Sequence, residues 1–173
     1  RFILGDAGTR LIFIPEQVRS LEFPSMLAAL RNELPQLEHV VTVRAGTQHP
    51  GMLRYEDLVR SAPVDLAALP TVDPNAIKAV LYTSGTTGHP KGAVSTHRAV
   101  VQALMGFGCK SSIDSLRRPD EAAGRTGAPC FILIVPLFHV TGNVPVLLGS
   151  LASGLKLVIM HKWDPGRALQ LIE

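Results

Sequence analysis

Short apolar runs rich in β-branched residues recur along the chain, each bounded by glycine, proline or polar residues. This pattern predicts buried strands. The runs cover residues 10–14, 39–43, 77–82, 131–135 and 155–160. Segments with helical spacing of apolar residues lie between or after them, at residues 25–37, 55–60, 96–107, 144–153 and 165–173. Because strands that alternate with helices form βαβ crossovers, the sequence predicts an α/β fold, with a mainly parallel sheet and helices on both faces.

Residues at the ends of these segments agree with the helices. Ser25 and Thr96 each precede a helical pattern and carry a side-chain oxygen that can cap the first turn. Asp164 opens the last helix in the same way, followed by a proline. Gly154 follows the preceding helix, as a glycine C′ residue does. The sequence therefore predicts where these helices begin and end.

Two stretches are expected at the surface. Residues 44–74 are proline-rich and irregular, and residues 111–128 are polar and rich in glycine and charge, which predicts a mobile loop. A long apolar region runs from residue 130 to 160, but Pro136 and His139 are among the residues that interrupt it. A membrane span of about 20 apolar residues is therefore not expected.

The composition suits one globular unit over residues 1–173. The chain is 46% hydrophobic and 18% charged, enough for a core of its own. Its formal charge of +3 comes from scattered basic residues without interleaved aromatics, which argues against a nucleic-acid partner. Cys109 and Cys130 lack C-x-x-C spacing and the histidines lack metal-ligand spacing. We therefore expect reduced thiols, a cytoplasmic location and no structural metal.

A loop rich in hydroxyls and glycine follows the apolar run at 77–82 and ends in a lysine. It reads Thr83-Ser84-Gly85-Thr86-Thr87-Gly88-His89-Pro90-Lys91-Gly92. Glycines let backbone N–H groups turn inward, hydroxyls add donors, and Lys91 adds a compact positive charge, so the loop favours a polyphosphate ligand. The spacing excludes a P-loop, because Pro90 stands where that motif needs its second glycine. An ordinary turn is the alternative, but it needs neither a proline nor a lysine at fixed offsets.

A second motif ends the apolar run at 131–135. It reads Val135-Pro136-Leu137-Phe138-His139-Val140-Thr141-Gly142. Taken alone, it is most simply explained as a buried strand that ends at a proline, with a core histidine bonded to a carbonyl. Its position at the carboxyl end of a predicted parallel strand, like that of the first motif, favours a place beside a ligand.

Together the two motifs resemble those of the AMP-forming acyl/aryl-CoA synthetases, a superfamily of adenylate-forming enzymes that also includes luciferases and peptide-synthetase adenylation domains. The resemblance covers the two motifs tightly and the rest of the chain loosely. It implies part of the N-terminal domain of an adenylate-forming enzyme. Because members are longer chains, we expect a single α/β fragment over residues 1–173, with the C-terminal domain absent.

The resemblance also implies roles for individual residues. It assigns the phosphates of ATP to Thr83, Ser84, Gly85, Thr86, Thr87, Gly88 and Lys91, with His139 beside them. Lys91 would neutralise the terminal phosphates, and His139 would position the reacting groups. Ser84 would help to hold Mg²⁺, Thr141 and Asn143 would line the acyl pocket, and Lys162 would lie near the CoA phosphates. An exposed, solvated lysine is an equal alternative for Lys162.

By resemblance, the complete enzyme joins a carboxylic acid to ATP, forming an acyl-adenylate and pyrophosphate, and then passes the acyl group to coenzyme A. The Gly-Thr-Thr-Gly core with Pro-x-Phe-His favours a CoA ligase over a peptide-synthetase domain, although luciferases share both motifs. Motifs for adenine and ribose and the catalytic lysine of the C-terminal domain are not found in these residues, so the chain alone is expected to be inactive. A non-catalytic nucleotide-binding or interaction module of the same fold is the alternative. The acid and its chain length are left open, and an aliphatic acid of fatty acid metabolism is one option.

Overall fold

The computed structural model describes residues 1–84, 88–120, 129–160 and 162–172. These residues fall into two compact units. The first contains residues 1–71 and the described part of 84–90, and the second contains residues 72–83 and the described part of 91–173. The chain between residues 61 and 76 is exposed throughout, so no buried side chain there extends either core.

The first unit contains a three-stranded parallel sheet in the order β1-β4-β5. These strands are β1 (Leu11–Pro15), β4 (His39–Val43) and β5 (Leu53–Arg54). The other elements are α1 (Phe2–Asp6), β2 (Gln17–Val18), β3 (Leu21–Glu22), α2 (Phe23–Leu30), η1 (Arg31–Glu33) and α3 (Tyr55–Leu58). The core of this unit is formed by Ile14, Leu27, Leu34, Leu37 and Val40. Apolar side chains from β1, β4 and the α2 region therefore stabilise the sheet, as the strand pattern predicts.

The first helix begins earlier than the sequence predicts. It starts at Phe23 with Glu22 in the N-cap position, so the expected cap at Ser25 is wrong. The Ser25 hydroxyl donates instead to the Glu22 carboxylate (3.4 Å). Pro24 explains the difference, because its fixed φ and missing N–H suit the first turn of a helix. The helix ends at Leu30 and is followed by a short 3₁₀ turn, η1, so the expected helix is wrong for residues 34–37.

The second unit begins with an antiparallel hairpin of β6 (Ile77–Thr83) and β7 (Lys91–Thr96). β7 was not expected from the sequence. The connection covers only residues 84–90, too short for the crossover helix that parallel strands need. The chain therefore reverses direction here, while the pairs β1–β4, β4–β5 and β8–β9 are parallel.

Helix α4 (His97–Arg117) follows the hairpin and begins where the sequence predicts. The Ala99 N–H donates to the Thr96 hydroxyl (3.2 Å), which confirms the cap. The helix continues past residue 107, so the expected surface loop is wrong for residues 111–117. Lys110 and Asp114 form an i,i+4 ion pair in this part of the helix. Residues 121–128 of the predicted loop lie outside the described residues.

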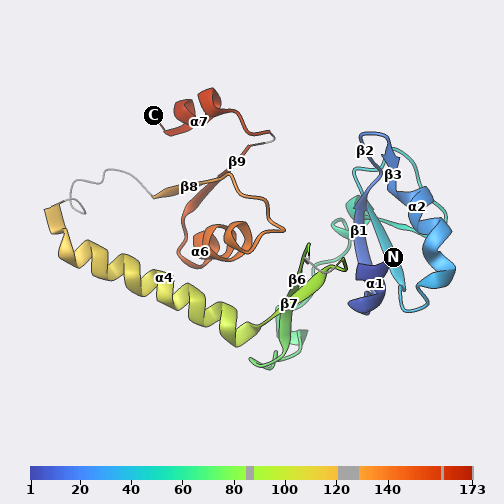
Figure 1. The fold of residues 1–173 in the computed structure, drawn as a ribbon, viewed down its shortest axis with the longest axis horizontal. Coiled ribbons are helices and arrows are strands. Elements are labelled where there is room, and N and C mark those ends of the chain that lie inside the picture. The colour runs from blue at the N-terminus through green and yellow to red at the C-terminus, as the bar shows by residue number, and fades with distance from the viewer. Residues whose placement is uncertain (85–87, 121–128, 161, 173) are drawn as a thin grey trace. The chain divides into compact units, whose positions relative to one another are not determined.

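The end of the chain contains the predicted βαβ crossover. Strands β8 (Cys130–Leu133) and β9 (Lys156–Ile159) pair in parallel, and a π-helical segment, η3 (Gly142–Leu148), and α6 (Gly149–Ala152) connect them (Figure 1). Gly154 has a positive φ of 63°, as predicted for a residue that ends a helix. Helix α7 (Pro165–Ile172) follows Asp164, whose carboxylate accepts from the Arg167 N–H (2.6 Å). The predicted α/β class with mainly parallel pairing is thus observed.

None of the helices in the described residues combines the length and the apolar character needed to cross a bilayer.

Candidate functional site

The hydroxyl-rich motif lies at the end of the β6–β7 hairpin. Thr83, the last residue of β6, is paired directly with Lys91, the first residue of β7. Both side chains are exposed, and so is Ser84, which follows Thr83. Gly88 has a φ of 95°, a conformation that other residues rarely adopt. The hairpin thus presents two hydroxyls and one ammonium group to solvent at the same end. Gly85, Thr86 and Thr87 lie outside the described residues.

The Lys91 ammonium is not neutralised by any residue that the structure describes. Within the ranges that the structure describes, it takes part in no ion pair or hydrogen bond. An unpaired ammonium beside exposed hydroxyls is suited to an anion, because each group can donate without giving up an existing partner.

Gly92 has a packing role that the motif alone does not reveal. It lies opposite Tyr82 in the hairpin, and a Cβ at this position would lie 2.7 Å from Val80 Cγ1 and 3.3 Å from Tyr82 Cζ. Real Cβ atoms essentially never approach to 2.7 Å, so a side chain at position 92 would require Val80 to move. Gly92 belongs to the strand ladder and supports the hairpin next to Lys91.

The second motif forms a tight turn after β8, and its histidine is fixed by backbone hydrogen bonds. The His139 N–H donates to Pro136 O (3.0 Å), and its carbonyl accepts from the Asn143 N–H (3.1 Å). The Thr141 N–H donates to Nδ1 of the ring (3.2 Å). An accepting Nδ1 carries no proton, so the neutral ring carries its proton on Nε2. His139 is exposed, and among the described residues its ring is not bonded to a carbonyl, whereas the core alternative requires such a bond.

The predicted acyl-pocket residues flank His139. Thr141 is exposed, whereas Asn143 is half-buried and its side-chain amide donates to Leu137 O (3.5 Å). Lys162, predicted near CoA, is exposed and makes no ion pair with any residue that the structure describes.

The predicted residues therefore form two local groups. Thr83, Ser84 and Lys91 lie at the hairpin end, and His139, Thr141 and Asn143 lie in the turn after β8. No hydrogen bond or ion pair between described residues joins the two groups.

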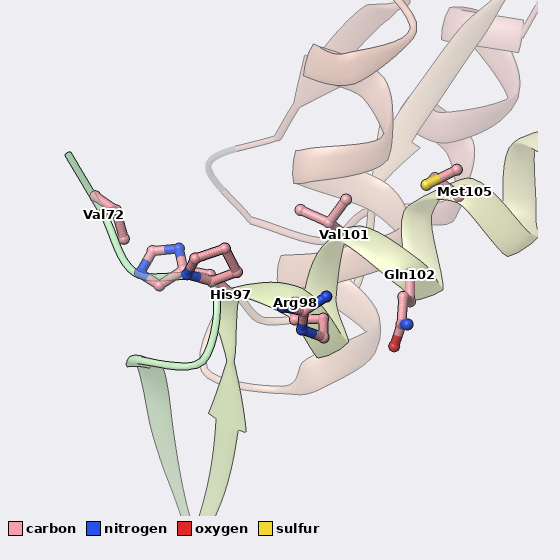
Figure 2. Close-up of a pocket in the computed structure, with 7 residues that line it drawn as sticks. Val72, His97, Arg98, Val101, Gln102 and Met105 are labelled. Carbon is pink, nitrogen blue, oxygen red and sulfur yellow. The ribbon is translucent and has the colours of Figure 1, made fainter.

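A cavity of about 390 Å³ lies at the start of α4 (Figure 2). It is lined by Val72, Pro74, His97, Arg98, Val101, Gln102 and Met105. None of these is a predicted site residue. Arg98, whose side chain is charged, donates from Nε to the Asn75 side chain (3.0 Å). Four of the seven lining residues, Val72, Pro74, Val101 and Met105, are apolar.

A separate polar cluster lies in the first unit, around Glu16. Its carboxylate accepts from the Gly46 N–H (2.8 Å), the Thr47 hydroxyl (2.9 Å) and His49 Nε2 (2.9 Å). These hydrogen bonds, that of Gly46 first, lower the pKa of Glu16 to about 2. The cluster ties the segment after β4 to the end of β1 and contains none of the predicted site residues.

Comparison with known proteins identifies the family. The model of the AMP-binding enzyme family matches residues 1–173. The chain belongs to the AMP-binding enzyme family. A 3-methylmercaptopropionyl-CoA ligase of Ruegeria lacuscaerulensis is 30% identical over 97% of this chain and 29% of its own length. A medium-chain-fatty-acid–CoA ligase of Ectopseudomonas oleovorans is likewise 30% identical, over 97% of this chain and 28% of its own length.

Solved structures of AMP-binding enzymes share the fold. The crystal structure of an anthranilate CoA ligase in complex with anthranoyl-AMP superposes with a TM-score of 0.69, at 23% identity, over 99% of this chain and 29% of that one. The α/β fold is therefore that of the N-terminal domain of adenylate-forming enzymes, as the motifs imply. The chain spans less than a third of the length of the two curated relatives.

Proposed function

We propose that this chain supplies the polyphosphate-binding part of an AMP-forming acid–CoA ligase. The observation that carries the proposal is the hairpin end, where Lys91 lies directly across from Thr83 without a carboxylate partner in the described residues. The CoA ligases named among the relatives support the reaction class.

In the proposed reaction, a carboxylate oxygen attacks the α-phosphorus of ATP. The new bond is the acyl–phosphate anhydride, and the bond that breaks is the one to the β-phosphate, so pyrophosphate leaves with the electron pair. The thiolate of coenzyme A then attacks the acyl carbon, and AMP leaves. Since negative charge accumulates on the leaving pyrophosphate, donors around the β- and γ-phosphates stabilise the transition state more than the ground state.

The hairpin end has the chemistry for this task. The Thr83 and Ser84 hydroxyls and the Lys91 ammonium are exposed at the same end of the hairpin, and all three can donate to phosphate oxygens. We extend the phosphate cradle to Gly85, Thr86, Thr87 and Gly88 on the strength of the motif. Lys91 neutralises charge on the terminal phosphates, where negative charge accumulates as pyrophosphate leaves.

Magnesium fits this proposal as an ion held mainly by the nucleotide. In the described part of the chain, no group of three His, Cys, Asp or Glu side chains could hold a metal. The exposed Ser84 hydroxyl is an oxygen ligand of the kind that Mg²⁺ accepts beside phosphate oxygens. When bound, Mg²⁺ would supply positive charge that neutralises the phosphates.

His139 acts in this proposal as a positioning donor. Its Nε2–H can donate to the substrate carboxylate or to the α-phosphate, while Nδ1 is occupied by the Thr141 N–H. Thr141 and Asn143 form the nearby wall of the acyl pocket, and their small polar side chains do not define one acid. Lys162 makes no ion pair with the described residues and offers its positive charge to the phosphates of CoA.

We also propose a cellular location and a substrate class. We place the enzyme in the cytoplasm, because both cysteines, Cys109 and Cys130, are free thiols. An organic acid such as a fatty acid is the proposed substrate class, which the names of the relatives support.

The test is acid-dependent exchange of pyrophosphate into ATP by the full-length protein, followed by thioester formation on addition of CoA. A panel of aliphatic and aromatic carboxylic acids covers the substrates that the names of the relatives and of the anthranilate CoA ligase suggest. Exchange that requires one of these acids supports the ligase. Saturable ATP binding without exchange for any acid would support the non-catalytic module instead.

A further inference from the structure

We infer that Gly142 is a positioning residue for His139, an inference that rests on the proposed function of the histidine. Gly142 is the first residue of η3 and is buried. It packs against the backbone of residues 135 and 136, which follow β8.

A side chain at this position has no space. A Cβ on Gly142 would lie 2.5 Å from Pro136 O, 2.6 Å from Val135 O and 3.0 Å from Pro136 C. All three are backbone atoms, so no change of rotamer can relieve the contact. Any residue other than glycine must displace the start of η3 from residues 135 and 136.

The two neighbours of Gly142 in the sequence donate hydrogen bonds to His139. Gly142 lies between Thr141, whose N–H donates to His139 Nδ1 (3.2 Å), and Asn143, whose N–H donates to the His139 carbonyl (3.1 Å). The bond to the ring is already at the long end of the normal range for an N–H···O or N–H···N bond. A shift of a few tenths of an ångström is enough to remove it.

Loss of this bond changes what the ring can do. With Nδ1 accepting from Thr141, the neutral ring has one orientation and carries its proton on Nε2. Without the donor, the ring can rotate and either nitrogen can carry the proton. The Nε2–H then no longer points in a fixed direction, which weakens its contact with a carboxylate or phosphate in the transition state.

The test uses the full-length protein with its histidines labelled with ¹⁵N. Gly142→Ala is compared with Gly149→Ala as a matched control. Gly149 is the first residue of α6, and a Cβ there would have Val144 O at 3.7 Å as its nearest neighbour. We expect the Nε2–H tautomer of His139 in the wild type and in Gly149→Ala, and a mixture of tautomers in Gly142→Ala. We also expect the exchange kcat of Gly142→Ala to fall about 10- to 100-fold with little change in the KM for ATP.

Two further variants separate positioning from general damage. Thr141→Pro removes the N–H donor at a φ of −62° that proline accepts, so it tests the same bond if Gly142→Ala does not fold. In a His139→Ala background, Gly142→Ala should lower exchange less than twofold, because the residue acts through the histidine.

An unchanged His139 tautomer in both Gly142→Ala and Thr141→Pro would overturn the inference. Equal losses of exchange with and without His139 would overturn it too, since they indicate a structural role. The tautomer is measured without substrate, so a change of tautomer in a protein that exchanges no pyrophosphate would leave the positioning intact and remove only the proposed reaction.

Discussion

Replacement of Lys91 by alanine is the most direct test of the hairpin as a phosphate site. The side chain lies at the first position of β7, exposed, and it has no carboxylate partner in the described part of the chain. Its removal therefore breaks no existing ion pair. Any loss of activity must come from a contact made only when the anion is bound.

The expected loss of activity in Lys91→Ala follows from the type of contact that the ammonium makes with phosphate. A hydrogen bond to a charged group contributes about 1.5–3 kcal/mol. At about 1.4 kcal/mol for each factor of ten, Lys91→Ala should lower kcat/KM for adenylation about 10- to 150-fold. Because the ammonium is exposed in this chain, we expect the smaller end of this range and a loss that shrinks as salt is added.

The assay is pyrophosphate exchange by the full-length protein at saturating acid, with ATP varied. Lys78→Ala is the matched control. Lys78 lies on the same hairpin in β6, five residues before Thr83 and therefore about 17 Å along the strand from the hairpin end. It carries the same charge and should have little effect. Thermal unfolding of both variants checks that the fold survives.

Wild-type exchange by a folded Lys91→Ala protein would refute the assignment of Lys91 to the phosphate site. A loss of the same size in Lys78→Ala would also refute it, because the effect would then reflect the general charge of the hairpin.

Three further predictions test other parts of the molecule. The difference in free energy of unfolding between wild type and Glu16→Gln should shrink as the pH falls from about 4.5 to about 2. The lowered pKa of Glu16 makes its charge stabilising above this pH range, and the charge is lost as the pH falls through the range. Denaturation curves at several pH values measure the difference, and a difference that does not change with pH would contradict the prediction. Thr96→Ala should lower the free energy of unfolding by about 1 kcal/mol, because the Ala99 N–H loses its acceptor at the start of α4; unchanged stability in urea denaturation would show that the cap contributes nothing. Lys162→Ala should raise the KM for CoA about two- to tenfold without changing pyrophosphate exchange; an unchanged KM in steady-state kinetics would favour the solvated-lysine alternative.

Local signals in the sequence were sufficient for much of the fold. The apolar run at residues 39–43 coincides with β4, and Thr96 caps α4 as expected. Both depend on contacts within a few residues, because strand propensity and caps are local properties. Ser25 shows the limit of this reasoning, since the nearby Pro24 favoured an earlier start of the helix.

The two motifs also determined the family without any tertiary information. The residue types at the hairpin and after β8 predicted the family, and the family comparison confirms that resemblance. Sequence alone did not reveal that the hydroxyl-rich loop joins antiparallel strands. It did not reveal the packing roles of Gly92 and Gly142 either, because both depend on atoms of other residues that fold against them.

The sequence by itself thus determined the alternation of strands and helices, the family and the residue types at the proposed phosphate site, because each of these depends on short stretches of chain. Tertiary structure alone decided that Lys91 faces Thr83 without a carboxylate partner among the described residues, and that the Thr141 N–H fixes the proton of His139 on Nε2. The physical reason is that pairing, close packing and the direction of a hydrogen bond depend on distances between atoms, which residue order limits but does not specify.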